Sequence, residues 1–435
     1  MKFLVSNIFF FITTTIVIFV IVSGFYTGFI FYVAMIISWL GFLYCAYSYY
    51  KNSERLINPT TCFCLSVFVF LVSRPFLSLL MGDEVISIGL GITEENIIKA
   101  TLFVMWSFYL INIFYCFFDK PAKFILNGMP DIKIKSYTWS NVFLLFSLFL
   151  SFLFLKNSYF NYNVLSNNEN YFSFISSLDF SYFRYFFISK YFLILYIVLS
   201  KSNKSLLIST SILFLSSLGF MAIGLRGYTI AYLFLFLLAY DVKYKIKLIP
   251  LIVLSLSLII LSASVLSFRL GFDVFENDSY LSIILKTIAQ QGATFEVVFG
   301  AVNFLDEINK CISYYDYFIQ GIPFGDCVDV SRGVYFAEGG FASSFFAELV
   351  FFWPILILII PLFSFCLKLL SLSYDQILSS GSEKKSSILL VFFLLPNLVY
   401  FARSSVFDFI EKTIISIFFI LFISLVIKII RKKDA

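Results

Sequence analysis

The sequence predicts an all-α integral membrane protein with about 12 transmembrane helices and one large loop on the outer side. Of its 435 residues, 60% are hydrophobic and 13% are charged, and the mean hydropathy is +0.95. So few charged side chains cannot cover a water-soluble globule of this size. Long uncharged runs recur along the chain at about the 20-residue length that a bilayer-spanning helix needs. A soluble enzyme is therefore excluded, and the net charge of +5 alone gives no reason to expect nucleic acid as a partner.

The uncharged runs define the expected helices in chain order. The run between Lys2 and Lys51 is long enough for two helices, with a turn around Gly24 and Gly28. Its first half is longer than a signal-peptide core, so we interpret it as a retained membrane anchor. The twelve predicted spans are 3–23, 28–50, 59–80, 97–118, 137–155, 183–200, 205–223, 227–240, 248–267, 342–367, 387–402 and 413–430.

Lysine residues set the predicted orientation. They concentrate in alternate connections, for example at Lys51, Lys120, Lys123, Lys243 and Lys385, whereas most acidic residues fall in the other connections. Because short cytoplasmic loops carry an excess of Lys and Arg, both termini are predicted to be cytoplasmic.

The predicted helices leave one long connection. Residues 1–267 hold the first nine spans, residues 268–341 form the large outer loop, and residues 342–435 hold the last three spans and a cytoplasmic tail. Apolar residues at helical spacing between Ser279 and Leu305 predict one or two interfacial helices in the loop. The outer loop also holds Cys311 and Cys327, which either form a disulfide worth roughly 3 kcal/mol or remain free thiols.

Arginines do not follow the lysine distribution. Most of them map to the outer ends of helices or to outer loops, where the topology rule disfavours cations. Guanidinium keeps its charge in a low dielectric and matches phosphate oxygens in a bidentate way, so a diphosphate at the outer surface would explain the bias. Alternatively, each one snorkels to the interface or pairs with an acid. The outer arginines are Arg74, Arg184, Arg226, Arg269, Arg332 and Arg403.

Two stretches have an informative local context. In GLRGY (224–228), Gly227 follows Arg226 at a tight outer turn, where a bare backbone would allow close approach of a ligand; a plain helical hairpin is the alternative. In SRGVYFAEGGFASSFFAEL (331–349), Glu348 lies about two turns into an apolar run. A carboxylate at that depth is costly unless it is paired or faces water, so Glu348 is either functional or ion-paired.

The twelve spans, GLRGY at an outer turn, Arg269 just after a span, and a large outer loop ending in GGFASSFFAEL resemble the bacterial O-antigen polymerases (Wzy family). The resemblance covers nearly the whole chain, but its motifs are short. It implies a GT-C-like fold in the inner membrane, a periplasmic large loop, and transfer of a growing glycan from undecaprenyl diphosphate to the next lipid-linked repeat unit. It also implies that Arg226, Arg269 and Arg332 engage the diphosphate, and it leaves open whether a chain-length regulator protein is a partner.

The resemblance is chemically compatible with the residues. Arginines in a water-poor site would stabilise the charge that develops on a diphosphate leaving group. A general base would assist the attacking hydroxyl by accepting its proton. Glu348 is the first candidate for this base, followed by Glu338 and Asp273. No cofactor or metal is expected, because the chain has no His and no obvious ligand cluster. The missing His also disfavours the related O-antigen ligases, and the long outer loop disfavours a lipid-linked oligosaccharide flippase.

Overall fold

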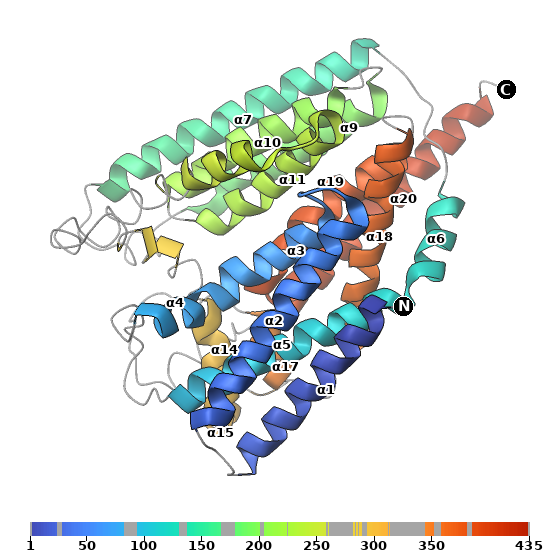
Figure 1. Cartoon of the computed structure of the whole chain (residues 1–435). Helices are drawn as coiled ribbons and strands as arrows, with labels where there is room; N and C mark the ends of the chain where they lie inside the picture. The colour runs from blue at the N-terminus through green and yellow to red at the C-terminus, as the bar shows by residue number, and fades with distance from the viewer. Residues whose placement is uncertain are drawn as a thin grey trace.

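In the computed structural model every described element is a helix (Figure 1). The described residues are 2–23, 28–81, 94–129, 137–166, 179–200, 204–223, 225–257, 260, 282, 284, 285, 287, 288, 294–311, 313, 344–351, 358–380 and 385–433. The elements are α1 (Lys2–Val22), α2 (Gly28–Ser53), α3 (Pro59–Val67), η1 (Phe68–Val72), α4 (Ser73–Met81), α5 (Glu94–Phe117), α6 (Asp119–Gly128), α7 (Tyr137–Ser166), η3 (Phe180–Tyr182), α9 (Phe183–Leu199), α10 (Ser205–Ala222), α11 (Arg226–Tyr244), α14 (Thr294–Asn303), α15 (Leu305–Cys311), α17 (Phe345–Phe351), α18 (Ile359–Ser380), α19 (Lys385–Tyr400), η8 (Phe401–Arg403) and α20 (Val406–Lys433).

The helices form two groups joined by a central pair. Helices α7, α9, α10 and α11 pack together on one side, and α1, α2 and α5 pack together on the other. Between the groups, α18 contacts α5 and α19, while α19 contacts α11 and α20. In Figure 1 the start of α1, the end of α20 and α6 lie at one end of the bundle, and α14 and α15 lie at the opposite end.

Six of the described helical segments are long and apolar enough to cross a membrane. They are Lys2–Ile21, Pro59–Leu77, Glu95–Phe117, Thr138–Val164, Ser205–Ala222 and Lys385–Arg403. Apolar side chains on the outward faces of α1, α7 and α20 are exposed, as expected for surfaces that contact lipid. The chain is therefore a multi-pass, predominantly helical membrane protein, and the count of twelve spans remains a prediction.

The helix boundaries follow local sequence signals. At α3, Asn58 and Thr61 form a reciprocal capping box, and Pro59 occupies the first turn, where its missing N–H costs nothing. The predicted span 59–80 then runs through α3, the π-helix η1 and α4.

The described residues extend two of the predicted spans. Within the predicted span 342–367 they belong to α17 and to α18, and α18 continues to Ser380. Helix α7 extends to Ser166, past the predicted end at residue 155. In the stretch Ser279–Leu305, helix α14 packs against α5, α17 and η1; most of its side chains are apolar, and its single acid, Glu296, pairs with Arg74.

Connections that the lysine pattern assigns to the cytoplasm contact one another. Arg55 lies 3.3 Å from the Asp241 carboxylate, Lys368 lies 3.0 Å from Asp119, and Lys385 donates a 2.9 Å hydrogen bond to the Ser200 carbonyl oxygen. Tyr374 adds a 2.7 Å hydrogen bond to Asp241. The polar ends of distant helices therefore lock together on this side of the bundle.

Candidate functional site

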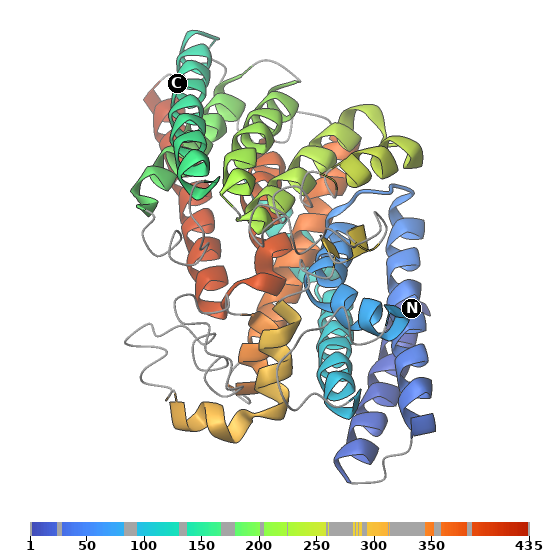
Figure 2. The ribbon, with the colours of Figure 1, turned by 90° about the vertical axis from the view of Figure 1, so that its left-hand side faces the viewer.

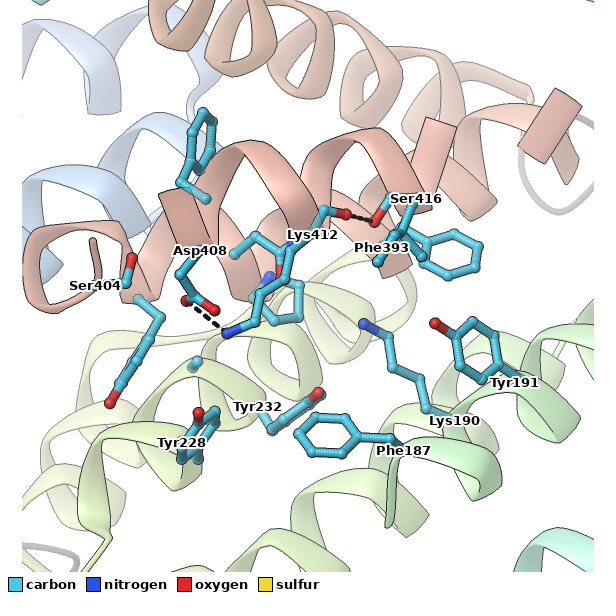
Figure 3. A pocket seen from close by; sticks show the side chains of 16 residues that line it. Phe187, Lys190, Tyr191, Tyr228, Tyr232, Phe393, Ser404, Asp408, Lys412 and Ser416 are labelled. Atoms are coloured by element: carbon cyan, nitrogen blue, oxygen red, sulfur yellow. Dashed lines mark hydrogen bonds and ion pairs between the residues drawn. The ribbon is translucent and has the colours of Figure 1, made fainter. Parts of the chain in front are cut away.

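A cavity opens among the described helices on the side where α9, α11 and α20 begin (Figure 3). Figure 2 shows the ribbon of the bundle from a direction turned by 90° from that of Figure 1. Its volume is about 100 Å³. The lining comes from the first turns of α9, α11 and α20 and from the last turns of α19. The adjoining connections are those that the charge pattern assigns to the outer side.

Two lysines from different helices face this cavity. Lys190 extends from α9 toward the face of α20 that carries Lys412 (Figure 3), and their ammonium charges repel each other. Lys412 is bound to Asp408 at 2.6 Å. No carboxylate of the described residues pairs with Lys190, whose ammonium lies 5.3 Å from the ring centre of Phe393. The cavity therefore carries an excess of positive charge suited to an anionic ligand.

Aromatic rings form much of the remaining wall. Tyr228 and Tyr400 stack with ring centres 4.8 Å apart and an interplanar angle of 18°. The Lys412 ammonium lies 5.7 Å from the first ring and 5.9 Å from the second. Tyr232 and Tyr191 add further rings (Figure 3). Such side chains offer apolar faces together with hydroxyl groups, which suits a ligand that combines sugar rings with charge.

The GLRGY turn lies beside the cavity, and the structure explains its second glycine differently from the sequence. A Cβ atom on Gly227 would come within 2.5 Å of the Tyr400 ring and 3.4 Å of the Arg403 side chain. The close approach is therefore made by the chain's own Tyr400 rather than by a ligand. Arg226 is the first residue of α11, and Arg403 ends η8 between cavity-lining residues 400 and 404. The structure thus brings this motif and Arg403 together.

Two other arginines lie elsewhere. Arg184 is exposed near the start of α9, 5.7 Å from the Tyr185 ring centre. It precedes Phe187 and Tyr191 by three and seven residues, so it shares the helix face that reaches the cavity. Arg74 is buried in α4 and forms an ion pair with Glu296 of α14. That contact fits the ion-pair alternative, and Arg74 does not line the cavity.

Glu348 is fully buried in α17. Its Oε2 accepts a 2.6 Å hydrogen bond from the backbone N–H of Val406, the first residue of α20. Ser344 makes a second link by donating to the Ala402 carbonyl oxygen at 3.0 Å. The carboxylate thus holds an otherwise unpaired N–H at a helix N-terminus, where negative charge is favourable. Glu348 positions the start of α20 and does not line the cavity.

The remaining expected site residues, Asp273, Arg269, Arg332 and Glu338, lie outside the described residues. Cys311 is disulfide-bonded, and its expected partner Cys327 also lies outside them. Cys45, Cys62, Cys64, Cys116 and Cys366 are free.

The sequence analysis missed two charged residues that the cavity reveals. Asp408 and Lys412 precede the predicted span 413–430 and looked like part of a connection, whereas α20 already begins at Val406. Their spacing of four residues was the available signal, because it places both on one helix face. Among the described residues, no three side chains of metal-binding type come together.

The fold and the cavity define a multi-pass helical membrane protein with a cationic, aromatic-lined cavity. Comparison with known proteins identifies the family. Residues 7–323 match the family described as O-antigen polysaccharide polymerase Wzy. An O-antigen polymerase of Escherichia coli is 36% identical over 386 residues, which cover 85% of this chain and 84% of that protein. The chain therefore belongs to the Wzy family of O-antigen polymerases. No solved structure is significantly similar to it.

Proposed function

We propose that this protein is an O-antigen polymerase that transfers a growing glycan from undecaprenyl diphosphate to the next lipid-linked repeat unit. Its family and its Escherichia coli relative support the activity. The observation that carries the substrate assignment is the cavity in which Lys190 and Lys412 face each other among tyrosines. The negative charge of a diphosphate would balance the excess positive charge of the cavity, and the aromatic rings suit the attached sugar.

The proposed setting is the bacterial inner membrane, with twelve spans, a GT-C-like architecture, both termini in the cytoplasm and the cavity near the periplasmic face. Lysine-rich connections support this orientation. The start of α1 and the end of α20 lie at the same end of the bundle, which agrees with an even number of spans (Figure 1).

In this proposal, cationic side chains stabilise the negative charge that develops on the leaving group. As the glycosidic bond to the diphosphate breaks, negative charge builds on the leaving oxygen, and preorganised cations in a water-poor site stabilise it. Lys190 and Lys412 are placed for this task inside the cavity, with Arg403 beside it. Arg226, Arg269 and Arg332 complete the diphosphate site as the family resemblance implies, and Arg184 attracts the lipid at the mouth. No metal ion is required, so chain extension is expected to persist in EDTA.

Binding of undecaprenyl diphosphate to the purified protein in detergent tests the assignment. Lys190→Gln and Lys412→Gln should each weaken binding about tenfold or more, because each removes a charged contact worth roughly 1.5–3 kcal/mol. Lys243→Gln is the matched control, since Lys243 lies on α11 near its other end and contacts Tyr244. Unchanged binding by the Lys190/Lys412 double variant would show that the diphosphate binds elsewhere.

The activity itself is tested in cells that lack the gene. They should accumulate lipid carrying a single repeat unit, and the intact gene should restore long glycan. A complete loss of surface glycan would indicate a flippase or a ligase instead.

A further inference from the structure

Asp408 is an acidic residue whose side chain lines the cavity and can contact a ligand there. Among the described residues that line the cavity, it is the sole acid. It lies in the first turn of α20, where its backbone N–H donates a 2.9 Å hydrogen bond to Ser405 Oγ. This contact, together with the Glu348 contact to Val406, fixes the turn that carries Asp408. The side chain is therefore held on a well-anchored helix end.

The two oxygens of this carboxylate have different surroundings. Oδ2 accepts the 2.6 Å hydrogen bond from Lys412. Oδ1 accepts no hydrogen bond from the described residues, and the carboxylate points into the space between α20 and α11 (Figure 3). One oxygen is thus anchored and oriented while the other remains available to an incoming hydroxyl group.

Glu348 differs in each of these respects. It is fully buried, it accepts a hydrogen bond from the backbone N–H of Val406, and it does not line the cavity. A base must come within hydrogen-bond reach of the proton that it removes. Asp408 meets that requirement for a ligand in the cavity, and Glu348 does not.

We propose that Asp408 is the general base of the polymerisation, an inference that rests on the proposed function. The acceptor sugar hydroxyl attacks the anomeric carbon of the donor glycan, and its proton passes to Asp408 Oδ1. The bond between the anomeric carbon and the diphosphate oxygen breaks, and its electron pair leaves with undecaprenyl diphosphate. Lys190 and Lys412 stabilise that leaving group, and Asp408 later returns the proton to water. No oxidant or further reactant is needed.

A purely structural role for Asp408 makes a different prediction. An acid in the first turn of a helix interacts favourably with the helix dipole, and its pair with Lys412 at four-residue spacing stabilises the helix. If Asp408 only held Lys412 in place, removing its charge would act like removing Lys412 and would weaken substrate binding. A base would instead be needed for turnover and not for binding.

The test uses the full-length protein in detergent and lipid-linked repeat units extracted from cells that lack the gene. Asp408→Asn should lower kcat about 100-fold or more, as expected for loss of a general base, while KM and undecaprenyl diphosphate binding stay within about threefold. Lys412→Gln should mainly weaken binding. The pair Asp408→Glu and Asp408→Gln has matched side-chain length, so only the carboxylate variant should retain measurable turnover. If Asp408→Asn does not fold, the comparison of the Glu and Gln variants still tests whether a carboxylate is needed for turnover.

Three results would overturn the proposal. One is wild-type kcat in Asp408→Asn. Another is a rise in KM equal to that of Lys412→Gln with kcat unchanged. The third is equal turnover of the Glu and Gln variants. Failure of the proposed function looks different, since the wild-type protein would then neither bind undecaprenyl diphosphate nor extend the repeat unit.

Discussion

The burial of the ion pair between Arg74 and Glu296 sets how much free energy of unfolding is lost when one partner is removed. The two side chains are only 6% and 9% exposed, and they connect α4 to α14 across more than 200 residues of sequence. Removing one partner of a buried pair leaves an uncompensated charge and costs about 3–5 kcal/mol. Replacing both partners by apolar side chains of similar size is often neutral. Arg74→Met and Glu296→Leu should therefore each destabilise the protein, and the double variant should recover most of the loss.

The measurement is a double-mutant cycle of unfolding in detergent, together with glycan length in cells that lack the chromosomal gene. At 1.4 kcal/mol per factor of ten, each single variant should lower the folded-to-unfolded ratio roughly 100-fold or more. The double variant should regain long glycan along with stability. If it regains stability and still makes no long glycan, Arg74 contacts the substrate after all. Single variants as stable as the wild type would show that the pair does not hold α4 against α14.

Further predictions concern the cavity wall and the opposite end of the bundle. Gly227→Ala should cost about 1–3 kcal/mol, because the new methyl group overpacks against Tyr400; thermal unfolding in detergent measures it, and an unchanged midpoint would contradict the close contact. Glu348→Gln should shorten the glycan and lower stability while leaving some activity, because the amide oxygen can still accept the hydrogen bond from the Val406 backbone. Glycan length is measured on a gel, and a Glu348→Gln variant less active than Asp408→Asn would contradict a positioning role. Asp241→Asn should cost about 3–5 kcal/mol, because Asp241 is buried and pairs with a cation, and denaturant unfolding measures the loss. Hydrogen bonds from Lys123 and Lys368 lower the pKa of Asp119. Its stabilisation of α6 is therefore complete above the ordinary carboxyl pKa and is lost progressively as the pH falls from that value through the lowered pKa, which proteolysis near α6 as a function of pH should show.

Much of the fold was predictable because bilayer thickness fixes the length of each apolar run. The boundaries at Lys2, Pro59 and Ser205 agree with the predicted starts of spans within a residue or two. Uncharged sequence alone could not show that α18 continues to Ser380, or that polar residues after 155 continue α7. In both places packing against other helices determines the outcome, and composition does not encode it.

The site was predictable only in part. GLRGY and Arg403, both singled out from the sequence, lie next to the cavity. The sequence could not show which charged side chains would meet, because Arg74 and Glu296 lie far apart in sequence, as do Lys190 and Lys412. Such pairs are created by the tertiary packing of helices. The sequence analysis also favoured the most deeply placed acid, whereas burial directed Glu348 to a backbone N–H and left Asp408 facing the cavity.

The links from α17 to residues 402 and 406 have a mechanical consequence. Through Glu348 and Ser344, the short helix α17 is fastened to the segment that carries Arg403 and Asp408. A shift of α17 would therefore also move Arg403 and Asp408, so the geometry at the cavity depends on a helix that does not line it.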